Sequence, residues 1–158
     1  MIKTYQYRIY PTYSQRQTFE KQLEACQVLY NQALAMRKEA YEHSGETLTY
    51  NKQSKMLTQL RQKSAFWTSA HCGILQDALR RLDKAYKAFF RRVKKGEKPG
   101  FPRFKGKGRY RSMTYFCLSA ELIRSAKGRL AHVVVPKIGQ VKIRLMIART
   151  LSSSSRSQ

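Results

Sequence analysis

The spacing of hydrophobic residues changes along the chain, and it predicts a strand followed by helices. Residues 3–10 alternate between two faces and stop at Pro11, as a strand does. From residue 15 to residue 43 the spacing becomes three or four, with no Gly or Pro to interrupt it. This pattern predicts one long helix, for which Thr12 or Ser14 can supply the N-cap.

Two further helices are predicted in the middle of the chain. Gly45 opens a loop, and Thr49 or Asn51 can cap a short helix over residues 52–63. A longer helix over residues 72–93 carries basic side chains on much of its surface and an apolar stripe on one side. The stripe consists of Leu75, Leu79, Leu82, Tyr86, Phe89 and Val93. We expect the apolar face to pack in a core and the basic face to meet anions.

Strand-like segments return after the last helix. Residues 112–118, 129–135 and 140–147 are rich in β-branched and aromatic residues or alternate in polarity. The N-terminal strand needs partners, and these later strands supply them most simply. We predict an α+β fold with a three-helix lobe inserted into a small β-barrel or sheet. The predicted parts are a β part (1–11 and 103–148), a helical lobe with a basic loop (12–102) and a disordered tail (149–158).

The formal charge of +23 on 158 residues narrows the choice of partner. Self-repulsion of this size favours binding to a polyanion, which could be a nucleic acid, an anionic membrane or an acidic protein. Nucleic acid is favoured because the charge runs through patterned segments. A membrane-binding helix needs a free apolar face, and the stripes here are expected to pack in a core. With no signal-peptide pattern and no membrane-length apolar run, we predict a cytoplasmic protein.

The charge is densest over residues 80–111, which hold fourteen Lys and Arg, two acids and several aromatic rings. Basic groups neutralise phosphates, and rings between them stack on unpaired bases. Phe101, Phe104 and Tyr110 could stack on bases or pack against the barrel. Lys3 and Arg8 would add charge from the first strand. The other predicted nucleic-acid-binding residues are Arg80, Arg81, Lys84, Lys87, Arg91, Arg92, Lys94, Lys95, Lys98, Arg103, Phe104, Lys105, Lys107, Arg109, Tyr110 and Arg111.

The residues that usually carry catalysis or bind metals form no pattern in this chain. The three histidines are scattered, and no phosphate-binding glycine loop or nucleophile motif is present. Cys26, Cys72 and Cys117 are far apart, with no CxxC pair, and we expect them to be buried small hydrophobes. We therefore predict no cofactor, no metal and no catalytic centre.

Two blocks of sequence resemble the OrfB/TnpB proteins that transposons encode. The first has Tyr10-Pro11-Thr12 after a basic, aromatic strand, then Cys26 and Tyr30-Asn31 within a helix. The second runs LQDALRRLDKAYKAFF over residues 75–90 and continues as GFPRFK over residues 100–105. The order and spacing of the two blocks make the resemblance specific, and it covers about residues 1–147.

The resemblance implies nucleic-acid partners. The N-terminal part of such proteins is commonly described as a helix-turn-helix domain. In RNA-guided members, which are similar to compact type V CRISPR effectors, it forms a β-barrel wedge with an inserted helical recognition lobe. That lobe contacts a structured guide RNA and the target DNA duplex next to the transposon. Gln76, in the family's Leu-Gln position, would read a base edge through its amide, or it is an ordinary exposed glutamine.

The chain departs from the family in its catalytic half. The family's RuvC-like nuclease has an Asp/Glu/Asp set and a zinc ribbon, and neither is present here, where Glu121 is the last acid. We expect a truncated chain, the DNA- and guide-RNA-binding N-terminal portion of a transposase-associated RNA-guided endonuclease, without a catalytic centre of its own. The alternative is a structural RNA-binding protein of ribosomal-protein character, which needs only charge and a small core.

Overall fold

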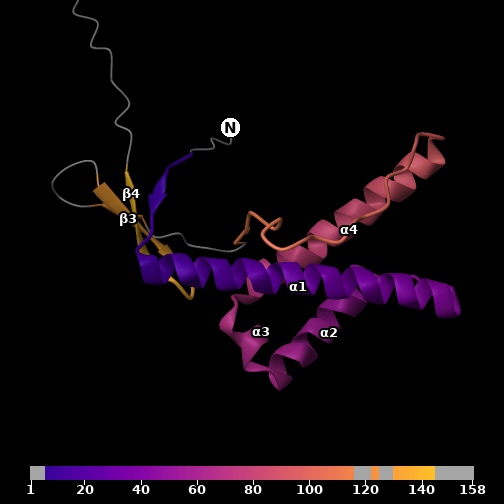
Figure 1. Cartoon of the computed structure of the whole chain (residues 1–158), viewed down its shortest axis with the longest axis horizontal. Helices are drawn as coiled ribbons and strands as arrows, with labels where there is room; N and C mark the ends of the chain where they lie inside the picture. The colour runs from indigo at the N-terminus through magenta and orange to yellow at the C-terminus, as the bar shows by residue number, and fades with distance from the viewer. Residues whose placement is uncertain (1–5, 116–121, 125–129, 145–158) are drawn as a thin grey trace, which may run out of the picture. The chain divides into compact units, whose positions relative to one another are not determined.

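The computed structural model of the chain (Figure 1) describes residues 6–115, 122–124 and 130–144. These residues fall into two compact units. Residues 16–115 form a helical unit, and residues 6–15 with 122–124 and 130–144 form a sheet unit. Helices followed by an antiparallel sheet confirm the α+β class.

The sheet unit has four described strands in the order β1-β4-β3-β2, and each neighbouring pair is antiparallel. Their bounds are Ile9–Tyr10 (β1), Leu122–Arg124 (β2), Leu130–Val135 (β3) and Gly139–Arg144 (β4). Ile9 pairs with Ile143, and Val133 pairs with Val141. β1 and β2 are the two edges, so the described strands form an open sheet and not a closed barrel.

The strand predictions were partly right. Residues 129–135 contain β3, and residues 140–147 overlap β4, which begins one residue earlier. Within 3–10, only Ile9–Tyr10 pair among the described residues. Residues 112–115 are not a strand: Arg81 of α4 donates to Ser112 and Thr114, and the Tyr115 hydroxyl donates to Gln22 of α1. β2 lies between the predicted strands 112–118 and 129–135, in a stretch where no strand was predicted. Parts of the predicted strands lie outside the described residues (3–5, 116–118, 129 and 145–147).

The helical unit confirms the three predicted helices and adds a short fourth one. The helices are α1 (Tyr13–Ser44), α2 (Tyr50–Lys63), α3 (Ala65–Ser69) and α4 (Cys72–Lys94). α1 begins with a reciprocal cap: the Gln15 N–H donates to Thr12 Oγ1 at 3.3 Å, and the Thr12 N–H donates to Gln15 Oε1 at 3.0 Å. Thr49 caps α2. The five residues of α3 are too few to show a helical period.

The end of α4 sets the course of the chain that follows. Gly96 takes a left-handed conformation, with φ of 70°, and its N–H donates to the Val93 carbonyl. The Glu97 N–H donates to the Arg92 carbonyl at 3.0 Å, so α4 ends in a Schellman motif. The chain then turns back and runs along α4, as the orange segment in Figure 1 shows. Residues 103–115, predicted to join the β part, therefore lie with the helices.

The core of the helical unit is formed by facing sides of α1, α2 and α4. Its largest fully buried side chains include Leu34, Ile74, Leu75, Leu79 and Leu82. Burial also raises the pKa of the Cys26 thiol to about 12, so this cysteine is neutral, as predicted for a small hydrophobe. The same prediction is wrong for Cys72, which is exposed at the start of α4. Cys117 lies outside the described residues.

Candidate nucleic-acid interface

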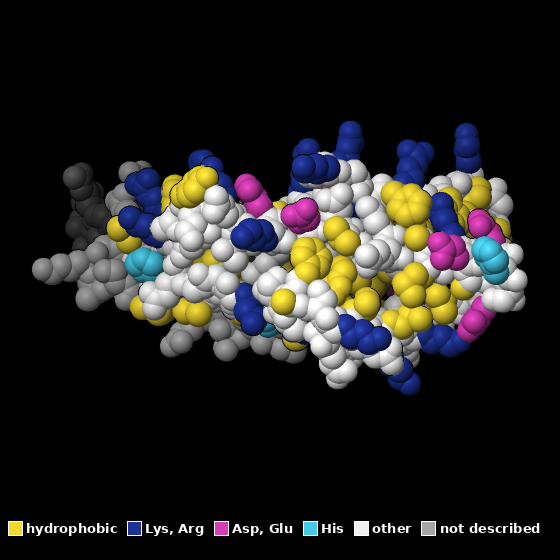
Figure 2. Space-filling view, turned by 60° about the horizontal axis from the view of Figure 1, so that its bottom comes forward, with side chains coloured by type: hydrophobic (Ala, Val, Ile, Leu, Met, Phe, Trp, Pro, Cys, Tyr) yellow, Lys and Arg dark blue, Asp and Glu magenta, His cyan; other side chains and the backbone are white. Residues whose placement is uncertain are grey.

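α4 carries a row of exposed cations opposite its buried leucines. The row, called here the α4 basic stripe, consists of Arg80, Lys84, Lys87, Arg91 and Lys94. Their spacing of three or four residues places them on one side of the helix. Gln76 is half-buried one turn before Arg80, on the same side. In Figure 2, Lys and Arg side chains project along the upper margin over the helices, and hydrophobic side chains gather below.

The segment after α4, called here the return loop (residues 95–115), adds further cations. Its exposed basic residues are Lys95, Lys98, Arg103, Lys105, Lys107, Arg109 and Arg111. Arg92, at the end of α4, is also exposed. Because the return loop runs back along α4, the cations of the helix and those of the loop belong to the same unit.

The return loop is held by two amide side chains of α1. The Asn31 Nδ2 donates to the Lys105 carbonyl at 2.9 Å, and the Lys105 N–H donates to Asn31 Oδ1 at 2.8 Å. Gln27 donates a third hydrogen bond to the same carbonyl. Lys105 Nζ lies 5.7 Å from the Tyr30 ring centroid. The Tyr30-Asn31 and GFPRFK segments, which carry the family resemblance, thus meet in space, and the loop backbone is fixed while its cations stay exposed.

Arg81 differs from its neighbours because its guanidinium turns inward. It donates to the Ser112 carbonyl and hydroxyl and to Thr114 Oγ1, at 2.8–3.1 Å. Its Nε lies 2.7 Å from the buried Asp77 carboxylate. Arg81 therefore fastens the return loop to α4. We interpret it as a residue that positions the loop, not as one that contacts phosphate.

The three aromatic residues predicted to stack on bases have different surroundings. Tyr110 is 7% exposed, with its ring 6.4 Å from that of Tyr30, and burial is the main reason that its pKa is raised. It belongs to the core. Phe104 is 51% exposed, and Lys38 Nζ lies 4.9 Å from its ring centroid. Phe101 is partly exposed and packs edge-on against rings of α4.

Of the two predicted cations of the first strand, Arg8 lies in the sheet unit. Arg8 is exposed, with its guanidinium 5.8 Å from the Tyr10 ring. Lys3 lies outside the described residues.

Asp83 connects the basic stripe to the core. Lys87 Nζ lies 2.9 Å and Arg37 Nη2 3.2 Å from its two carboxylate oxygens. Burial alone would raise the pKa of Asp83, but hydrogen bonds from Lys87 and Arg37 outweigh burial and hold the pKa below its usual value. Arg37 is itself buried and also donates to Gln53. Asp83 thus keeps its charge near neutral pH and balances a buried guanidinium.

No cluster of three His, Cys, Asp or Glu residues suitable for a metal ion occurs in residues 6–115, 122–124 and 130–144. In the same part of the chain, no helix has the length and apolar character needed to cross a membrane.

Comparison with known proteins confirms the resemblance to the OrfB/TnpB proteins. Residues 1–46 match the OrfB family described as a helix-turn-helix domain. The chain is 28% identical over 136 residues to a Streptomyces pristinaespiralis protein named "Putative RNA-guided DNA endonuclease", a match that covers 85% of this chain and 33% of that protein. It is 26% identical over 116 residues to the protein InsQ of Escherichia coli K12, named in the same way, covering 72% and 28%. The chain spans about a third of the length of these relatives.

The described part of the matched segment does not have helix-turn-helix geometry. That motif needs two helices joined by a turn of three or four residues. Residues 6–46 instead contain β1 and the single helix α1, which continues to Ser44. The α4 basic stripe lies outside the matched residues. The feature that favours a nucleic-acid partner is therefore the charge of α4 and its loop, and not the motif in the family's description.

Proposed function

We propose that this chain binds nucleic acid through the α4 basic stripe and the return loop. In this proposal it is the DNA- and guide-RNA-binding N-terminal portion of a transposase-associated RNA-guided DNA endonuclease, without a catalytic centre of its own. Its partners are the target duplex next to the transposon and a structured guide RNA. The observation that carries the proposal is the row of exposed cations on α4, opposite Leu75, Leu79 and Leu82.

The length of the stripe fits a phosphate backbone. From Arg80 to Lys94 the helix rises about 21 Å at 1.5 Å per residue. Phosphates of one strand follow each other every ~3.4 Å along a duplex, so the stripe spans about six of them. The leucines on the other side of α4 are buried, so the stripe is held on a stable support. The names of the two relatives agree with a nucleic-acid partner.

The salt dependence of binding tests the proposal. If six to ten phosphates are contacted, affinity should fall about 10³- to 10⁵-fold between about 50 and 200 mM salt. The double variant Lys84→Gln/Arg91→Gln should reduce the slope of log K against log salt by about 1.8 for duplex DNA, or about 1.4 for a single strand. Fluorescence anisotropy with labelled duplex DNA, single-stranded RNA and a folded RNA measures both quantities.

A matched control removes two cations elsewhere on the same unit. Lys55 and Lys63 are exposed on α2, and Lys55→Gln/Lys63→Gln changes the net charge by the same amount. The control should leave the slope near that of the wild type. Equal losses in both double variants, or an affinity that ignores salt, would refute the assignment to α4. Tight binding to folded RNA with none to duplex DNA would favour the structural RNA-binding alternative.

A further inference from the structure

The distal half of α4 borders a cavity of about 470 Å³ that the basic stripe does not explain. The cavity lies between the C-terminal part of α1, the loop that follows it, α4 and the return loop. It belongs entirely to the helical unit. Its volume is within the ~300–1,000 Å³ range of pockets that enclose small organic groups. The rings that line it are Tyr41, Tyr86, Phe89, Phe90 and Phe101.

Phe90 is the most exposed of the three α4 rings that line the cavity. It contacts Tyr86 at 6.3 Å and Phe89 at 5.2 Å between centroids, yet half of its surface is exposed. A second cavity of about 420 Å³ is also lined by Tyr86 and Phe90, so both rings border two hollows. Two adjoining hollows around exposed aromatic rings offer faces on which a flat group can stack.

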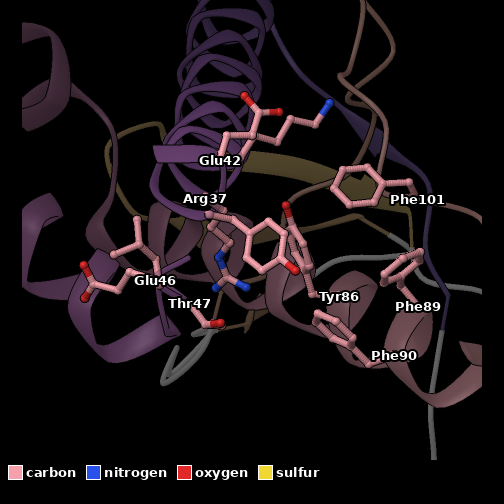
Figure 3. A pocket seen from close by; sticks show the side chains of 11 residues that line it. Arg37, Glu42, Glu46, Thr47, Tyr86, Phe89, Phe90 and Phe101 are labelled. Carbon is pink, nitrogen blue, oxygen red and sulfur yellow. The ribbon is translucent and has the colours of Figure 1, made fainter. Parts of the chain in front are cut away.

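The opposite side of the cavity is polar. Figure 3 shows Arg37, Glu46 and Thr47 to one side of the labelled phenylalanine rings, with Glu42 above them. Glu46 forms an ion pair with Lys52, and Arg37 lies 4.9 Å from the Tyr86 ring centroid. One wall is thus aromatic, and the other carries hydrogen-bond donors and acceptors. A nucleobase has the same division, with two flat faces and a polar edge.

We propose that this cavity receives one unpaired nucleobase from the nucleic acid bound along the α4 basic stripe. The inference rests on the proposed function and extends it. Stacking would take place on Phe90 and its neighbours, and the Glu42 carboxylate would accept from an exocyclic amino group, as acidic side chains do with bases. A base paired in a duplex cannot enter, so the site takes a single-stranded or extruded nucleotide.

The charges around Phe90 favour a base in the cavity and phosphates outside it. Lys87 and Lys94 lie three residues before and four residues after Phe90, so they flank its ring on the surface of α4. They can hold the phosphates on either side of the inserted nucleotide. Glu42 and Glu46 line the cavity together with Arg37 and Lys38, so the lining itself has no net charge to attract a phosphate. A protein partner with an apolar side chain would also fill the aromatic wall, but it would not use the flanking cations.

The test compares strands with and without bases. The probes are single strands of about 12 nucleotides, as oligo-adenylate in DNA and in RNA, and a DNA strand of the same length that is abasic throughout. The abasic strand keeps every phosphate, so it isolates the contribution of the bases. We expect the wild-type protein to bind the base-bearing DNA strand about 5- to 100-fold more tightly than the abasic strand. Comparing the RNA strand with the base-bearing DNA strand shows whether the site prefers ribose or deoxyribose.

The variant Phe90→Ala should remove most of this preference and leave the salt slope unchanged, because no cation is lost. Phe90→Leu keeps an apolar side chain and a folded distal helix, and it should lose the preference as well. Phe66→Ala is the matched control, since Phe66 is similarly exposed but lies on α3, outside both cavities. Thermal unfolding of each variant confirms that it is folded.

The outcomes separate this inference from the function on which it rests. Salt-dependent binding that is equal for base-bearing and abasic strands would overturn the nucleobase site and keep the proposed function. A preference that survives in Phe90→Ala and Phe90→Leu, or one lost equally in Phe66→Ala, would also overturn it and leave the cavity to a protein side chain. No binding to any strand at low salt would refute both.

Discussion

The two halves of α4 have the same hydrophobic spacing but different surroundings. In the first half, Leu75, Leu79 and Leu82 are at most 1% exposed. In the second half, the stripe continues to Val93, which is 49% exposed, next to Phe90 at 50%. The amphipathic pattern thus locates the apolar face along the whole helix, but it does not show how much of that face another element covers.

The difference separates residues of α4 that stabilise the fold from residues that are exposed to a ligand. α1 and α2 pack against the first half, and Tyr86 still packs against that core. Beyond it, the ring of Phe89 meets those of Phe90 and of Phe101 in the return loop. The α4 basic stripe runs along both halves. The first half therefore carries most of the buried contacts of the helix, and the second half carries its exposed apolar side chains.

The largest expected effect is a core substitution in the first half. Leu79→Ala should lower the free energy of unfolding by about 2–5 kcal/mol, because it leaves a cavity where no neighbour can move in. Val93→Ala, on the same stripe, should cost less than about 1 kcal/mol because the side chain is half in solvent. Urea denaturation of both variants gives the two values. Similar losses would mean that the second half of α4 is covered after all.

The helices could be predicted from the sequence because their signals are local. Three-to-four spacing, the Thr12 and Thr49 caps and Gly45 each act within a few residues of chain. The segment 112–115 has strand-like composition, but its conformation depends on Arg81 and Gln22, which are 31 and 93 residues away from their partners. Such long-range hydrogen bonds leave no periodic signal in one sequence.

The candidate site was predictable as a charge block but not residue by residue. Arg81 and Tyr110 stand among similar neighbours, and only their tertiary contacts show that one fastens the loop and the other packs in the core. The Asn31 clamp on Lys105 was missed for the same reason. Phe90 could not be singled out from spacing, because it lies four residues after Tyr86 and three before Val93 and so shares a face with the apolar stripe.

The next effect concerns the attachment of the return loop to α4. Arg81→Ala removes the hydrogen bonds to Ser112 and Thr114 and leaves Asp77 buried without its partner. We expect the free energy of unfolding to fall by about 1–3 kcal/mol and limited proteolysis to cut the return loop faster. Arg91→Ala is the control: it removes an equal charge from an exposed position and should change stability by less than about 0.5 kcal/mol. If both variants behave alike, Arg81 does not position the loop.

The smallest effect is at the junction of the two halves, where Asp83 balances Arg37 and Lys87. Because the folded pKa of Asp83 is lowered, its ionised form stabilises the fold above the unfolded pKa, and this contribution disappears as pH falls through the folded pKa. Asp83→Asn should therefore cost about 1–2 kcal/mol at neutral pH, mostly by leaving buried Arg37 unbalanced. The difference from the wild type should shrink below about pH 4.

Denaturation of both proteins at neutral and acidic pH measures this difference, and Glu97→Gln serves as its control because Glu97 is an exposed acid of the return loop. A difference that stays constant with pH would mean that shape, and not charge, makes Asp83 matter. A pH-dependent difference would show that the core half of α4 and the cations of its binding face are coupled through one carboxylate. Phosphate binding at Lys87 would then compete with Asp83 for the same ammonium group, and ligand binding would carry a small cost in the stability of the helix beneath it.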